Sequence, residues 1–159
     1  MDSLDLQVLT QARDWLDAGR QVWLVTVAQT WGSAPRPPGS LLCVRDDGLV
    51  VGSVSGGCVE DDLIDRVRKG ERVNQVQRIT YGVSKDEAAR FGLPCGGTLE
   101  LIQEPVLDVG WINALLERTA RHELIARQLN LDTGEVSLQQ SVDQVMQLLT
   151  ERGIVKQAN

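Results

Sequence analysis

The chain has 159 residues, of which 42% are apolar and 24% are charged, and its formal net charge is −6. These values describe a globular chain that is long enough to bury a core without metal or disulfide staples. The acidic balance, with scattered lysines and arginines, argues against a nucleic-acid partner. No apolar run approaches the ~20 residues that span a bilayer, and the acidic N-terminus is unlike a signal peptide. We therefore expect no membrane partner and a cytoplasmic location.

The three cysteines do not form a C-x-x-C pair. Such a set, in a reducing compartment, is neither a disulfide framework nor a complete zinc site, so we expect free thiols. Cys43 alternates with Leu41 and Arg45 in an expected strand, and a buried free cysteine usually behaves as a small apolar residue. We expect a structural role for it.

Local patterns predict an α-helix, three strands and a second helix in the first half of the chain. Gly19 ends the first helix, Asp46-Asp47-Gly48 is typical of a hairpin turn, and three acidic residues at 60–62 favour the first turn of the second helix. In chain order these elements are a helix over 4–18, a strand over 21–30, hairpin strands over 40–46 and 49–54, and a helix over 58–70.

The second half continues with strands and helices that do not strictly alternate. In chain order we expect a strand over 73–81, a short helix over 84–92, a strand over 98–104, a helix over 108–121, a hairpin over 123–138 and a helix over 142–152. This order predicts an α+β fold with a mixed or largely antiparallel sheet flanked by helices, a mixed-sheet α/β fold being the alternative. We expect a core domain over 1–105 and a helix-hairpin-helix extension over 106–159.

Three motifs carry the functional signal. The segment 32–39 reads Gly-Ser-Ala-Pro-Arg-Pro-Pro-Gly, the segment 55–60 reads Ser-Gly-Gly-Cys-Val-Glu at a helix start, and the segment 94–97 reads Pro-Cys-Gly-Gly. Glycine leaves backbone N–H groups uncovered, so such turns can hold an anion or let a bulky ligand approach the main chain. Two of the three motifs add a thiol.

The three motifs, in this order, resemble the N-terminal domain of the XdhC/CoxI family. The family pattern runs G-S-A-P-R-x-x-G, then a glycine-rich turn with a following glutamate, then C-G-G. The likeness extends over residues 1 to about 105 and makes that segment an XdhC/CoxI-like core. Residues 106–159 resemble the connecting segment of longer members and not their C-terminal Rossmann-like domain.

The resemblance implies an accessory protein rather than an enzyme. Family members bind molybdenum cofactor, as molybdopterin or its dinucleotide form, and carry it as cargo. They protect it and assist its insertion into molybdenum hydroxylases such as xanthine dehydrogenase, in some members with sulfuration of the metal. The expected partners are therefore an apo molybdenum hydroxylase and a cysteine desulfurase, and we expect a homodimer.

The chemistry of a phosphorylated, metal-bearing pterin agrees with the motif residues. Backbone N–H groups at Gly56 and Gly57 suit a phosphate at a helix N-terminus, and Arg36 suits a bidentate contact. Glu60 either binds a pterin amide edge or caps its own helix. The predicted cofactor-binding residues are Ser33, Arg36, Ser55, Gly56, Gly57, Cys58, Glu60, Cys95, Gly96 and Gly97.

The two motif cysteines differ in their surroundings. A helix start favours the thiolate of Cys58, whereas three acidic residues in the same turn disfavour it. Cys95 has no acidic neighbours in sequence and is the better candidate for contact with molybdenum, a soft metal centre. We assign no role to His122, and Trp31 beside the first motif is a candidate for stacking on the pterin.

Two other functions remain open from the residues. One is a small cysteine-dependent sulfur-transfer enzyme, which needs an activated thiolate at Cys58 or Cys95 and a basic partner. The other is a protein–protein interaction module in which the glycine pairs are only turns. A binding site requires that the three motifs lie together in the structure.

Overall fold

The computed structural model describes residues 3–31, 36–55, 57–82, 86 and 97–139. The chain divides into two compact units, residues 1–107 and 108–159. No helix among the described residues is long and apolar enough to cross a membrane.

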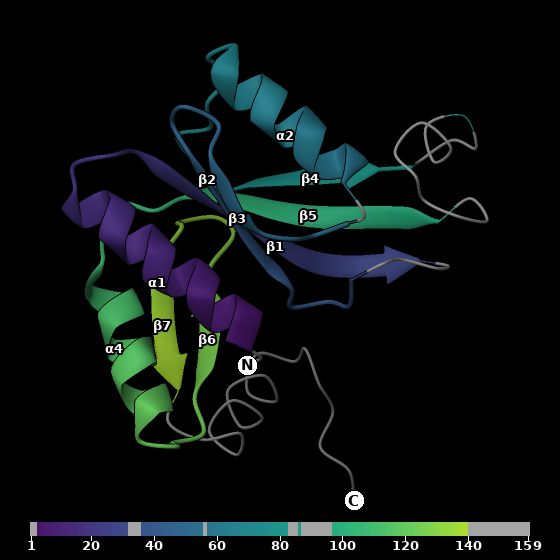
Figure 1. Ribbon diagram of the computed structural model, residues 1–159. Coiled ribbons are helices and arrows are strands. Elements are labelled where there is room, and N and C mark those ends of the chain that lie inside the picture. Colours follow the sequence, from purple (N-terminus) through teal and green to yellow (C-terminus); the bar gives the residue numbers. More distant parts are fainter. Residues whose placement is uncertain (1–2, 32–35, 56, 83–85, 87–96, 140–159) are drawn as a thin grey trace, which may run out of the picture. The chain divides into compact units, whose positions relative to one another are not determined.

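The first unit is built around one antiparallel sheet. Its elements are α1 (Ser3–Asp17), β1 (Val22–Trp31), β2 (Leu41–Arg45), β3 (Val50–Gly52), α2 (Cys58–Arg68), β4 (Gln77–Tyr81) and β5 (Thr98–Pro105). The described strands of this unit form a five-stranded sheet in the order β3-β2-β1-β5-β4, and every neighbouring pair is antiparallel (Figure 1). The α+β prediction is confirmed, and the mixed-sheet alternative is wrong for the described strands.

The two helices cover opposite faces of this sheet (Figure 1). Trp23 and Val25 share one apolar cluster with Leu63 of α2, because alternate residues of a strand point to the same face. The other face meets α1, where the Cys43 thiol donates a hydrogen bond to the Val8 carbonyl at 3.5 Å. Both helices therefore bury an apolar stripe, and β1 is buried between them.

Most predicted elements of the first unit are confirmed, with one shifted boundary. β4 begins at Gln77 rather than at Val73. The Val73 carbonyl accepts a hydrogen bond from the Trp23 indole N–H at 2.7 Å, so this carbonyl is bonded to a side chain rather than to the backbone of a neighbouring strand. The predicted helices over 84–92 and 142–152 lie outside the described residues, apart from Asp86.

The second unit contains α4 (Gly110–Ala120), β6 (Ala126–Leu129) and β7 (Val136–Gln139). β6 and β7 form an antiparallel hairpin, as predicted. Within this unit, the Arg127 guanidinium lies 4.3 Å from the centre of the Trp111 ring. The predicted helix and hairpin of this segment are therefore confirmed.

Candidate functional site

The strand register brings the flanks of the first and third motifs together. β1 ends at Trp31, which pairs with Thr98 at the start of β5. The chain returns beside β1, because the Gly39 N–H donates to the Val27 carbonyl at 2.8 Å and the Val27 N–H donates to the Ser40 carbonyl at 2.9 Å. The residues that border segments 32–39 and 94–97 therefore lie at one end of the sheet.

The second motif lies at the same end. Gly52, the last residue of β3, pairs with Leu42 near the start of β2. The Tyr81 hydroxyl at the end of β4 donates to the Asp62 carboxylate in the first turns of α2 at 2.7 Å. We call the end at which β1, β3 and β4 finish and β2 and β5 begin the motif end of the sheet (Figure 1).

Glu60 is the centre of the second motif. Its Oε1 accepts hydrogen bonds from the N–H groups of Val54 at 2.8 Å and Ser55 at 2.7 Å. Its Oε2 accepts from the Gly57 N–H at 2.9 Å and from the Ser55 hydroxyl. The Ser53 hydroxyl adds a contact to Oε1 at 3.3 Å. The carboxylate thus ties the turn to the helix that follows it, which is the capping role left open by the sequence.

These contacts decide the ionisation of Glu60. Burial by itself would raise the pKa of this carboxyl, since only 8% of the residue is exposed. The hydrogen bonds from the Ser55 hydroxyl and from the backbone N–H groups of Val54 and Ser55 outweigh it and hold the pKa below its ordinary value. Glu60 is therefore a buried carboxylate that is ionised at neutral pH.

The expectation that the Gly57 N–H receives a phosphate needs a correction. The group donates to Glu60, which occupies the place of an external anion. Gly57 itself has φ +127°, a conformation that favours glycine, and a side chain built on it would meet nothing within 4 Å. Open space therefore lies beside the N-terminus of α2.

The described cysteines have opposite environments. Cys43 is fully buried, and burial raises the pKa of its thiol to about 12, so the structural prediction for it is confirmed. Cys58, the first residue of α2, is exposed. An external ligand or reagent therefore reaches Cys58 and not Cys43.

The structure describes six of the ten predicted site residues. Ser55, Gly57, Cys58 and Glu60 form one continuous group, Arg36 is half-buried, and Gly97 is buried directly before β5. The remaining four lie outside the described residues: Ser33, Gly56, Cys95 and Gly96. Among the residues that the structure describes, no group of three histidine, cysteine or acidic side chains is placed to hold a metal ion. A contact between Cys95 and molybdenum stays a prediction.

Sequence reasoning offered the capping role of Glu60 as one alternative, and the capping-box spacing is the signal for it. It missed two other contacts at the motif end. Asp62, treated as a partner of the helix dipole, accepts the hydrogen bond of the Tyr81 hydroxyl. Ser53, which the motif did not include, donates its hydroxyl to the Ser55 carbonyl at 2.8 Å and to Glu60.

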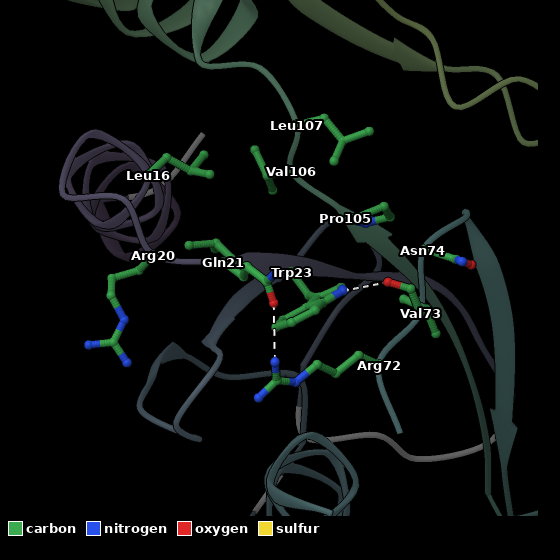
Figure 2. A pocket seen from close by; sticks show the side chains of 11 residues that line it. Leu16, Arg20, Gln21, Trp23, Arg72, Val73, Asn74, Pro105, Val106 and Leu107 are labelled. Carbon is green, nitrogen blue, oxygen red and sulfur yellow. Dashed lines mark hydrogen bonds between the residues drawn. The ribbon is translucent and has the colours of Figure 1, made fainter. Parts of the chain in front are cut away.

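A separate pocket of about 570 Å³ lies at the opposite end of the sheet (Figure 2). Arg72 lies across the Trp23 ring, 5.7 Å from its centre, and donates to the Gln21 side chain at 3.2 Å. Pro105 and Val106 complete its apolar wall. The pocket contains none of the predicted site residues, so the candidate site remains the motif end.

Comparison with known families identifies a relationship over part of the chain. Residues 15–82 match the family model described as the XdhC and CoxI family. The matched segment contains the first two motifs and extends to the end of β4.

Two curated relatives and one solved structure are similar to this chain. The molybdenum cofactor insertion chaperone PaoD of Escherichia coli (strain K12) is 33% identical over 113 residues, which cover 70% of this chain and 35% of that protein. A probable xanthine dehydrogenase subunit of Bacillus subtilis (strain 168) is 29% identical over 82 residues, or 51% of this chain and 24% of that protein. The chain thus spans about a third or less of the length of these relatives.

The solved structure is a protein described as a xanthine dehydrogenase from Bacillus halodurans. It superposes with a TM-score of 0.66 at 21% identity and covers 86% of this chain and 42% of that chain. At this identity the likeness supports the fold and nothing finer.

Proposed function

Because the chain belongs to the XdhC and CoxI family, we propose that it is an accessory protein that binds molybdenum cofactor and assists its insertion into a xanthine dehydrogenase-type molybdenum hydroxylase. One observation carries the proposal. The chain is similar, over 70% of its length, to a protein named as a molybdenum cofactor insertion chaperone. Its role is that of a carrier, with the cofactor as cargo and an apo molybdenum hydroxylase as partner.

The motif end of the sheet is the proposed binding site. A pterin that bears a phosphate and a dithiolene-bound metal needs a flat apolar surface, a cation and a soft ligand. Trp31, Arg36 and the two motif cysteines are side chains of these kinds. The open space beside Gly57 and the exposure of Cys58 suit an external ligand. The predicted ten-residue set remains the proposed site, in which the Gly57 N–H and Glu60 bind each other, and Cys95 is the proposed contact to molybdenum.

The finer parts of the function are proposals of the same kind. The protein protects the cofactor, cooperates with a cysteine desulfurase in its sulfuration, acts as a homodimer in the cytoplasm and catalyses no reaction itself. The cofactor is molybdopterin or its dinucleotide form. The parts that concern the cofactor and the desulfurase follow from the family resemblance, and every part is open to direct assay.

The decisive experiment is uptake of the cofactor. Under anaerobic conditions, the purified chain is mixed with cofactor released from a molybdenum hydroxylase and passed through a desalting column. Pterin fluorescence after oxidation and molybdenum analysis then measure what is retained. We expect about one cofactor per chain, and weaker retention by Arg36→Ala and Cys95→Ala. Absence of any retained pterin would overturn the proposal, and full retention by both variants would overturn the residue assignment.

Trp31 provides a second readout. Its side chain is 44% exposed at the motif end, whereas Trp15 and Trp23 are buried and have arginine guanidinium groups over their rings. Stacking of a heterocycle on an aromatic ring contributes about 1–3 kcal/mol, so Trp31→Leu should weaken binding roughly tenfold. Leu49→Ala, at a 50% exposed position in the β2–β3 turn at the other end of the sheet, is the matched control and should bind normally.

The exposure of Cys58 keeps a second function open to test. This function is sulfur transfer by a cysteine. The buried Cys43 is unsuited to it, which leaves Cys58 and Cys95. A sulfur carrier forms a persulfide when mixed with a cysteine desulfurase and its substrate, and mass spectrometry detects the added sulfur. A persulfide on either thiol, without retention of any pterin, would favour this alternative over the cofactor carrier. Absence of both would favour the interaction module.

A further inference from the structure

Glu60 combines a charge, a burial and a set of contacts that the proposed cofactor role does not explain. We infer that Glu60 is a positioning residue: its carboxylate binds the N–H groups of Val54, Ser55 and Gly57 before α2 from inside, so the cofactor meets a pre-assembled turn and its phosphate is received elsewhere. The inference rests on the proposed function and deepens it. It separates the groups that shape the site from those that touch the cargo.

The geometry is that of an anion site with its anion already in place. Backbone N–H groups of successive residues that point to one centre form a concavity of the kind that binds phosphate. Here the N–H groups of Val54, Ser55 and Gly57 lie within 2.7–2.9 Å of the two oxygens of Glu60. The Ser55 hydroxyl completes the set. A carboxylate of the chain itself therefore has the contacts that a ligand anion would make.

The charge of Glu60 affects what else the turn can hold. Two anions in contact with the same turn repel each other strongly when they are shielded from water. Glu60 is ionised and 8% exposed, so a phosphate beside it would face a like charge and would find the three donors taken. The phosphate of the cofactor then belongs with a cation, and Arg36 of the first motif is the cation among the described residues of the predicted set.

The contacts also require a carboxylate rather than an amide. Both oxygens of Glu60 act as acceptors, Oε1 for Val54 and Ser55 and Oε2 for Gly57 and the Ser55 hydroxyl. A glutamine has one oxygen and one NH₂ group, so one half of its amide would present donors to donors. The substitution keeps the size of the side chain but loses some of the hydrogen bonds that fix the turn. Cys58 follows that turn directly, so its position depends on these hydrogen bonds.

The experiment uses the full chain and three variants. Glu60→Gln tests the carboxylate at constant size, Glu60→Ala empties the turn, and Asp61→Asn removes the neighbouring exposed charge of α2 as the matched control. Cofactor retention and the thermal midpoint are measured for each, with and without 50 mM sodium formate, a small carboxylate that fits the emptied turn, and with inorganic phosphate as a second probe.

We expect Glu60→Gln to retain cofactor on the order of tenfold more weakly than the wild type and Asp61→Asn to retain it normally. We expect formate to raise the thermal midpoint of Glu60→Ala by about 3 °C, and not that of the wild type, because it returns an anion to the vacated donors. Formate should also restore part of the cofactor retention of Glu60→Ala, which a general loss of stability does not explain.

Two results would overturn the inference while leaving the proposed function intact. One is normal cofactor retention by both Glu60 variants. The other is tighter retention by Glu60→Ala that inorganic phosphate abolishes, which would make the turn the phosphate site. If the wild type binds no cofactor, the proposed function fails. Formate stabilisation confined to Glu60→Ala would still support the internal anion, and its absence would refute it.

Discussion

Substitution of Gly52 by alanine should destabilise the first unit severely. Gly52 ends β3 with φ +99°, where an L-residue is strained by about 1–3 kcal/mol. An added Cβ would lie 2.3 Å from the Leu41 carbonyl oxygen and 2.5 Å from Cγ2 of Val8. The carbonyl is held in place, since Ser53 N–H donates to it at 3.2 Å, so the clash adds about 1–3 kcal/mol of overpacking. The expected loss is therefore about 2–6 kcal/mol.

Gly19→Ala is the matched control for this prediction. Gly19 has φ +81°, and a Cβ built on it meets nothing within 4 Å, so its loss should be about 1 kcal/mol of backbone strain. Urea unfolding, followed by tryptophan fluorescence, gives the unfolding free energy of both variants. The two can be compared directly if the dependence of that free energy on urea concentration is the same. A loss for Gly52→Ala no larger than that for Gly19→Ala would refute the steric argument. If Gly52→Ala is too unstable for the titration, the soluble fraction of the two variants is compared instead.

Three further predictions concern the buried groups. Iodoacetamide at pH 8 should alkylate Cys58 in the native protein and reach Cys43 only in urea, as peptide mass spectrometry would reveal, because burial raises the pKa of Cys43 to about 12. Glu60 has a folded-state pKa below its ordinary value of 4.5, so its stabilisation is complete above that value and is lost as the pH falls through the folded pKa. The wild type and Glu60→Gln should therefore differ in unfolding free energy at pH 7 and converge in strong acid, and a constant difference would contradict this. Tyr81→Phe removes the 2.7 Å hydrogen bond to Asp62 and should cost about 1–2 kcal/mol in urea unfolding, whereas no loss would mean that water replaces the hydroxyl.

Local signals predicted the elements whose causes are local. The Asp46–Gly48 turn, the apolar stripe of α1 and the acidic start of α2 each depend on residues a few positions apart, and each element lies where the pattern indicates. β4 differs because the Val73 carbonyl is bonded to the indole of Trp23, a residue of another strand. No pattern near residue 73 contains that contact.

The strand order could not be predicted from the sequence, because it also depends on contacts between distant segments. β1 pairs with β2, its neighbour in the chain, and also with β5, which is separated from β2 by β3, α2 and β4. The second pairing depends on the complementarity of two buried strands across the whole unit, and it includes an irregularity between Val27 and Gln29. Neither the partner strand nor the irregularity can be recognised from the residues of either segment alone.

The sequence predicted which segments form the candidate site, but not the hydrogen bonds that connect them. The three motifs identified the segments that border the motif end, and Ser55, Gly57 and Cys58 lie there. The direction of the Glu60 side chain was open, because an acid in the first turn of a helix suits the dipole whether it points outward or inward. The burial of its carboxylate depends on the shape of the preceding turn, which only the folded backbone defines.

The pairing of β1 with β5 also sets the order in which the protein can assemble. During synthesis α1 and the β1–β2–β3 meander emerge first, and their contacts are close in sequence. β1 then has one free edge until β5 leaves the ribosome, and such an edge is a template for unwanted pairing. Trp31 meets Thr98 only when that edge closes. The motif end is thus the last part of this sheet to be completed, so a partly made chain carries the first two motifs before the strand that closes their end of the sheet.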